Sequence, residues 1–249
     1  MTPKRPLIIG NWKMNGVATA LDEARALAAA LEEKPPAAQV VLCPPATLLE
    51  RLGRLLVGTD IEIGGQDCAP AVSGAYTGDV AAEMLADAGA AFVIVGHSER
   101  RVDHGESSAL VAAKASAALR AGLTPIICLG ESLAHRRSGE AETVVANQLD
   151  QSLPDGFGAA DVCIAYEPVW AIGSGLTPSL AEIGAIHRVI RGRLMEMNSS
   201  AGQAASILYG GSVQPANAGA ILALDYVDGA LVGGASLRAA DFEAIIRAC

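Results

Sequence analysis

The stretch FVIVGHSERRVDHGESSALVAAKASAALRAGLTPIICLG, residues 92–130, contains the unit from which the fold can be predicted. It begins with the apolar run 92–96 and ends with a second apolar run, 125–130. Between them, the apolar residues of 107–122 recur at helical spacing, and Gly122 closes that segment as a helix stop. Runs that are apolar on both faces are typical of parallel strands covered on both sides. The stretch therefore predicts a strand, a helix and a second, parallel strand.

The same pattern recurs along the whole chain. Eight strand-then-helix units in 249 residues indicate an α/β protein, a single (β/α)8 TIM barrel. A doubly wound open sheet is the alternative, but it usually has fewer strands, and the fingerprint GxGxxG does not follow the first run. The predicted strands are the short apolar runs at 7–10, 40–43, 61–65, 92–96, 125–130, 162–166, 206–210 and 227–233.

No linker or change in composition divides the chain, so the sequence indicates no domain boundary. We expect one TIM-barrel domain over residues 1–249. Between the third and fourth runs the helical pattern is weaker, and a loop, 67–78, precedes a short helix.

Composition narrows the classes of function. The net charge of −9 argues against nucleic acid as a partner, because phosphate binding needs a basic face. The five cysteines form no CxxC pair, which favours buried thiols in a reducing compartment over disulfides. No uninterrupted apolar segment approaches the roughly 18 residues of a membrane span. We expect a cytoplasmic protein without a membrane partner.

Polar side chains stand at three of the expected strand ends. Asn11 and Lys13 follow the first run, His97 and Glu99 follow the fourth, and Glu167 ends the sixth. Alone, Lys13 is better explained as a solvated lysine and His97 as a structural histidine. In (β/α)8 barrels, however, the chemistry lies at the C-terminal ends of the strands. Because these residues share the C-terminal ends of the strands, a functional site is favoured over the separate explanations.

Glycine-rich turns follow the last two strands. Gly210, Gly211 and Ser212 follow the seventh run, and Gly233 and Gly234 end the eighth. Each alone could be a turn, but barrels commonly hold a phosphate at these two strand ends. Backbone N–H groups can approach an anion closely where no Cβ intervenes. No Walker motif occurs, so a small phosphorylated ligand is favoured over a nucleotide.

Other ionisable residues carry less information. His104, His135 and His187 show no metal-ligand spacing with one another or with cysteine, so we expect no metal site. Arg101 follows Glu99 closely, and we expect it to form an ion pair at the surface or at a subunit contact.

Five motifs resemble those of the triosephosphate isomerases and stand in the order of that family over essentially the whole chain. They are GNWKMN (10–15), VGHSERR (95–101), AYEPVWAIGSG (165–175), YGGSV (209–213) and DGALVGGASL (228–237).

The resemblance implies a glycolytic and gluconeogenic isomerase that interconverts dihydroxyacetone phosphate and glyceraldehyde 3-phosphate without a metal or an organic cofactor. It implies that Glu167 is the catalytic base and that His97 is a neutral electrophile, its pKa lowered by a helix N-terminus. Lys13 would stabilise the enediolate charge beside Asn11, and Glu99 would hold these groups in place. The phosphate would be bound by Gly173, Ser212, Gly233 and Gly234.

The resemblance also implies moving and associating segments. Residues 168–178 would form a lid, and the loop 73–79 would insert into a second copy to form a homodimer. One position departs from the family. Pro178 has no N–H, so a closed-lid hydrogen bond from Tyr209 to the backbone at this position cannot form.

Two other functions remain open. The motifs would also suit an isomerase of another short phosphorylated sugar. A catalytically silent barrel that acts as a binding protein is the second alternative, but it would not need Lys13, His97 and Glu167 together.

Overall fold

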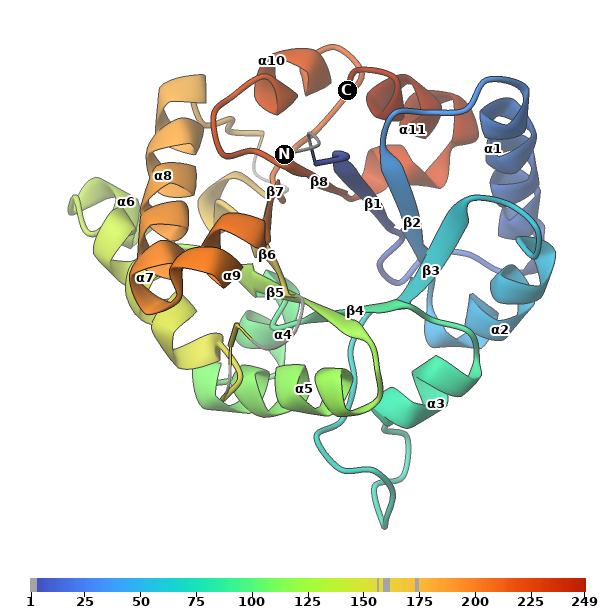
Figure 1. The fold of residues 1–249 in the computed structure, drawn as a ribbon, viewed down its shortest axis with the longest axis horizontal. Coiled ribbons are helices and arrows are strands. Elements are labelled where there is room, and N and C mark those ends of the chain that lie inside the picture. The colour runs from blue at the N-terminus through green and yellow to red at the C-terminus, as the bar shows by residue number, and fades with distance from the viewer. Residues whose placement is uncertain (1–3, 156, 159–161, 173–174) are drawn as a thin grey trace.

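The computed structural model describes residues 4–155, 157–158, 162–172 and 175–249. Within them, eight parallel strands close into a barrel in their order along the chain, and helices surround it (Figure 1). The strands are β1 (Leu7–Asn11), β2 (Gln39–Cys43), β3 (Ile61–Gly65), β4 (Phe92–Val95), β5 (Thr124–Leu129), β6 (Cys163–Tyr166), β7 (Ser206–Tyr209) and β8 (Gly229–Val232).

The helices of the outer layer follow the strands in sequence. The α-helices are α1 (Leu21–Glu33), α2 (Ala46–Leu55), α3 (Ala82–Asp87), α4 (Ser98–Asp103), α5 (Ser108–Arg120), α6 (Leu133–Arg137), α7 (Ala141–Ser152), α8 (Leu180–Met197), α9 (Ser199–Ala204), α10 (Ala218–Leu222) and α11 (Ala239–Ile246). Three short 3-10 helices are η1 (Ala18–Ala20), η2 (Val169–Ala171) and η3 (Gly234–Leu237).

The predicted barrel is confirmed, and each predicted apolar run overlaps one strand. The sheet closes where Leu7 of β1 pairs with Gly229 of β8. The outer layer closes beside it, because Glu23 of α1 accepts a hydrogen bond from the backbone N–H of Ala239 in α11 (2.7 Å). The open-sheet alternative is therefore wrong.

The strands bury both faces, as their apolar runs predict. Alternate side chains, such as Ile9 and Ile94, fill the barrel interior, while Ile8 and Val93 pack against the helices. Within the described residues no disulfide links the cysteines, of which four are buried and Cys249 is exposed.

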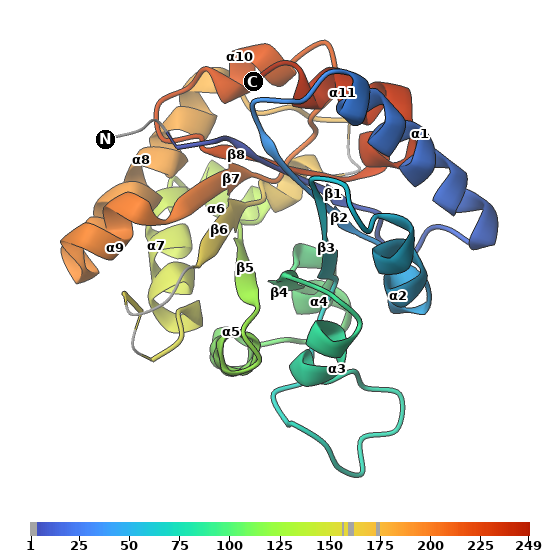
Figure 2. The same ribbon diagram turned by 45° about the vertical axis from the view of Figure 1, so that its right-hand side comes forward.

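The segment between β3 and α3 projects beyond the helices, as both views show (Figure 2). Gly74 and Gly78 adopt positive φ angles of 145° and 96°, which favour glycine. None of the helices in the described part of the chain is long and apolar enough to cross a bilayer.

Candidate active site

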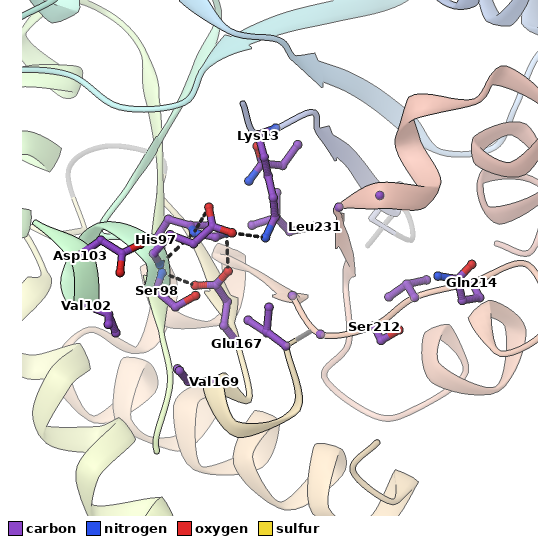
Figure 3. Close-up of a pocket in the computed structure, with 18 residues that line it drawn as sticks. Lys13, His97, Ser98, Val102, Asp103, Glu167, Val169, Ser212, Gln214 and Leu231 are labelled. Carbon is purple, nitrogen blue, oxygen red and sulfur yellow. Dashed lines mark hydrogen bonds and ion pairs between the residues drawn. The ribbon is translucent and has the colours of Figure 1, made fainter. Parts of the chain in front are cut away.

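The C-terminal ends of the strands surround a cavity of about 560 Å³ (Figure 3). Polar side chains from β1, α4 and the end of β6 line one part of it, and glycine-rich turns after β7 and β8 line another. The sequence-predicted residues in this lining are Asn11, Lys13, His97, Glu99, Glu167, Ser212, Gly233 and Gly234. Gly173 lies outside the described residues.

Glu167 is the most enclosed acid of the cavity, with 2% of its surface exposed. Its Oε1 lies 2.8 Å from Nε2 of His97, and its Oε2 accepts a hydrogen bond from the backbone N–H of Ser98 (2.8 Å). Its own N–H donates to the carbonyl of Leu129 (2.7 Å), which fixes the backbone at the end of β6. A Cβ at Gly210 would lie 2.9 Å from Cγ of Glu167, so glycine is needed for this close approach.

His97 is the N-cap of α4, and its Nδ1 accepts a hydrogen bond from the backbone N–H of Glu99 (3.3 Å). Nδ1 is therefore unprotonated, and the proton of the neutral ring is on Nε2, facing Glu167. Burial lowers the pKa of His97, but the charge and hydrogen bond of Glu167 and the charge of Glu99 raise it overall. The expected depression of this pKa is therefore not found while Glu167 contacts the ring.

Lys13 reaches across the cavity from the end of β1, and its Nζ lies 2.5 Å from Oε1 of Glu99. Its backbone is in the left-handed region, at φ 53°, which is unusual outside glycine. Asn11 and Gln66 stabilise this conformation, since Asn11 Oδ1 accepts from the N–H of Lys13 (3.0 Å) and Gln66 Nε2 donates to its carbonyl (2.8 Å). Burial raises the pKa of Glu99, but Lys13 and His97 lower it overall.

The glycine-rich side of the cavity leaves room for an anion. A Cβ at Gly233 would lie 3.5 Å from Cε of Lys13, and a Cβ at Gly234 would meet nothing within 4 Å. Gly234 begins η3, whose first N–H groups have no partner within the helix. Ser212 is exposed on the turn after β7, apart from Glu167 in the close-up (Figure 3).

The start of the predicted lid is held against the barrel. Trp170 of η2 donates its indole N–H to Oε1 of the buried Glu131 (2.7 Å), and Ile172 lines the cavity. Ser179 and Glu182 form a capping box that begins α8 just after the predicted lid. Among the described residues, the buried hydroxyl of Tyr209 has no hydrogen-bond partner.

Sequence reasoning missed two residues that complete the site. The backbone N–H of Ser98 binds Glu167, and the Gln66 side chain supports Lys13. Gln66 directly follows β3, so the strand-end rule could have found it. Ser98 stands in the same sequence motif as His97, but a backbone donor gives no signal in residue type.

The two arginines after Glu99 have different partners. Arg100 forms ion pairs with Asp67 (2.9 Å) and Glu106 (2.6 Å), which also bind the buried Lys114. Contrary to the prediction, Arg101 forms no ion pair with the described residues, because its guanidinium points inward and donates to carbonyl and hydroxyl oxygens instead.

Comparison with known proteins adds to this geometry. The family model described as triosephosphate isomerase matches residues 6–249. The triosephosphate isomerases of Caulobacter vibrioides and Afipia carboxidovorans are 58% and 56% identical, over 99% and 98% of this chain and 98% of each relative. The crystal structure of triosephosphate isomerase from Bartonella henselae is 45% identical, covers 98% of both chains and superposes with a TM-score of 0.91. The chain therefore belongs to the triosephosphate isomerase family.

Proposed function

We propose that Glu167, His97 and Lys13 together carry out the reaction of this family, the interconversion of dihydroxyacetone phosphate and D-glyceraldehyde 3-phosphate. The observation that carries the assignment is the contact between Nε2 of His97 and Oε1 of Glu167, at 2.8 Å, beside the cation of Lys13. The cavity thus combines a carboxylate, an N–H donor and a cation. All three belong to one barrel domain, which we take to extend over residues 1–249.

Glu167 is the proposed base. Its carboxylate takes the proton from the carbon beside the carbonyl, and the C–H electron pair becomes the C=C bond of an enediolate. The hydroxyl proton of the first carbon then passes to the oxygen of the former carbonyl, and the same carboxylic acid returns its proton to the carbon that bears that oxygen, which converts ketose to aldose. Burial supports this role, because a poorly hydrated carboxylate in a fixed position is an effective proton acceptor.

His97 and Lys13 are the proposed partners of the developing oxyanion. The Nε2–H of His97 donates to the carbonyl oxygen, and the ammonium group of Lys13 stabilises the negative charge. Asn11 lies beside Lys13, and Glu99 positions the Lys13 side chain through their contact. Fixed donors of this kind stabilise charge without reorganisation during the reaction.

Phosphate binding is assigned to the glycine-rich side of the cavity. Ser212 contributes a hydroxyl, and Gly233 and Gly234 contribute backbone N–H groups, with Gly173 of the lid as a further ligand. The step needs no metal ion or organic cofactor, since the base, the donor and the cation all come from side chains.

A homodimer is the proposed assembly. The loop 73–79 projects from the barrel, and Tyr76 on it is 56% exposed. A second hollow of about 760 Å³ adjoins the active site and is lined by Lys13, His97 and Met14, a residue that is 95% exposed. Insertion of this loop from a second copy would cover Met14 and brace Lys13. Buried cysteines without a disulfide among the described residues support a reducing, cytoplasmic location.

The experiment is a turnover assay of the purified protein with glyceraldehyde 3-phosphate, run in parallel with a four-carbon phosphorylated aldose. We expect efficient conversion of the triose phosphate. Faster turnover of the four-carbon sugar would assign a different substrate, and no turnover of either would indicate a silent barrel.

A further inference from the structure

The Arg101 side chain connects four elements behind the active site. Its Nε donates to the carbonyl of Gly96 (2.9 Å), and Nη2 donates to the carbonyl of Cys128 (3.1 Å). Nη1 donates to the hydroxyl of Ser108 (3.2 Å), and Nη2 also donates to that of Ser152 (3.0 Å). One guanidinium therefore joins the ends of β4 and β5 to α5 and α7.

This arrangement differs from an ordinary buried ion pair. Within the described part of the chain, no carboxylate lies at ion-pairing distance from Arg101. Its four acceptors are neutral, yet an arginine in a protein stays charged. Burial lowers the pKa of Arg101, and neighbouring negative groups, Glu167 among them, oppose that shift. Arg101 is only partly buried, but a cation that loses hydration without gaining a carboxylate partner still costs free energy, so packing alone gives little reason for a charged residue here.

The acceptors of Arg101 lie directly behind the catalytic groups. Gly96 precedes His97, and Cys128 precedes Leu129, whose carbonyl accepts from the N–H of Glu167. Gly96 has a φ of 65°, and a Cβ there would lie 3.1 Å from Nη2 of Arg101, so the guanidinium packs directly against this backbone.

Arg101 itself belongs to α4, the short helix that presents His97 and Ser98 to Glu167 (Figure 3). A cavity of about 150 Å³, lined by both Arg101 and Glu167, adjoins these residues. Arg101 therefore reaches Glu167 only through the backbone and through its charge.

We propose that Arg101 is a positioning residue for proton transfer, which fixes the start of α4 to the end of β5 and so sets the position of His97 relative to the backbone that carries Glu167. This inference rests on the proposed roles of Glu167 and His97. Arg101 has no contact with the turns after β7 and β8, so its loss should affect the proton-transfer groups and leave phosphate binding intact.

The test compares Arg101→Lys and Arg101→Met with a matched control, Arg191→Lys. Lysine keeps the charge but cannot reproduce the planar fork that reaches four acceptors. Arg191 is buried, donates to the carbonyl of Gly202 and pairs with Asp228 (2.7 Å). Asp228 directly precedes β8, so this arginine lies at the opposite end of the barrel from the catalytic groups.

The readouts are kcat, KM and the inhibition constant for inorganic phosphate, with the folded fraction of each variant measured by circular dichroism. A misplacement of about 1 Å can reduce a rate by on the order of 10²-fold. We expect kcat of the Arg101 variants to fall by about tenfold or more, with phosphate inhibition within about twofold of the parent protein. Arg191→Lys should unfold at lower temperature with an unchanged kcat. If Arg101→Met does not fold, Arg101→Lys decides alone.

Two results would overturn the inference. One is an unchanged kcat in folded Arg101→Lys. The other is a parallel loss of kcat and phosphate affinity, or an equal loss of kcat in Arg191→Lys, because either would indicate general loosening of the barrel. Absence of isomerase turnover in the parent protein would instead refute the proposed function, so the two failures are distinguishable.

Discussion

Nε2 of His97 and Oε1 of Glu167 lie 2.8 Å apart, so the proposed hydrogen-bond donor and the proposed base bind each other in this structure. A substrate carbonyl that accepts the Nε2 proton must replace Glu167 as its partner. Glu167 is then released toward the carbon from which the proton is taken. The backbone N–H of Ser98, 2.8 Å from Oε2, is a second contact that this movement must break.

Replacement of Lys13 by methionine keeps the length of the side chain and removes its charge. We expect a folded protein with kcat/KM reduced by at least about 10²-fold, the effect of losing one group that stabilises an oxyanion. Lys34→Met is the matched control, since Lys34 is exposed at the end of α1. Steady-state kinetics on both variants test this, and unchanged turnover in Lys13→Met would show that Lys13 is only a surface lysine.

Acid should destabilise the protein partly through His187. Burial lowers the pKa of this fully buried ring from 6.5 to about 4. Between these values the unfolded chain binds more protons than the folded one, so stability falls as the pH falls through this range. The full contribution is roughly 3 kcal/mol.

His187→Gln removes this titration. Urea unfolding at several pH values between about 6.5 and 4 should show a shallower loss of stability in the variant than in the parent protein. The variant is expected to be less stable near neutral pH, because a buried side chain is changed, so only the slope is compared. Equal slopes of unfolding free energy against pH in the two proteins would show that His187 is not the source of this loss of stability.

The proposed dimer predicts that charge on the loop 73–79 weakens association. Tyr76→Asp would have to bury a carboxylate in the second copy, which is costly without a partner. Val57→Asp is the control, because Val57 is 81% exposed and lies away from the hollow. Ultracentrifugation should give a dimer for the parent protein and Val57→Asp, and a larger monomer fraction and lower activity for Tyr76→Asp. A monomeric parent protein at micromolar concentration would refute the dimer.

Because Pro178 has no backbone N–H, we expect Tyr209→Phe and Ser212→Ala to reduce kcat/KM unequally. The Tyr209 hydroxyl has no partner among the described residues, and Pro178 offers no N–H to it. Tyr209→Phe should therefore change kcat/KM by a few-fold at most, within the 0.5–1.5 kcal/mol that a hydrogen bond typically contributes. Ser212→Ala should cost more, because it removes a proposed phosphate ligand. A larger loss in Tyr209→Phe would show that Tyr209 has another partner in the closed lid.

Most of the fold could be predicted because each apolar run is short, apolar on both faces and separated from the next by a helical segment. Lys13, His97 and Glu167 could be placed in one cavity because the C-terminal ends of all eight strands lie at the same end of the barrel. Contacts that depend on direction rather than residue type could not be predicted. Arg101 turns inward to backbone carbonyls although it follows an arginine that forms ion pairs. The left-handed backbone of Lys13 likewise has no signature in the sequence.

The most direct measurement is the turnover of Glu167→Asp with glyceraldehyde 3-phosphate, together with its inhibition by inorganic phosphate. Aspartate keeps the charge and retracts the carboxylate by one methylene, a displacement of roughly 1 Å that can cost on the order of 10²-fold in rate. We expect a fall in kcat of that order with phosphate inhibition unchanged. Near-parent turnover in the folded variant would contradict the role of Glu167 as the base.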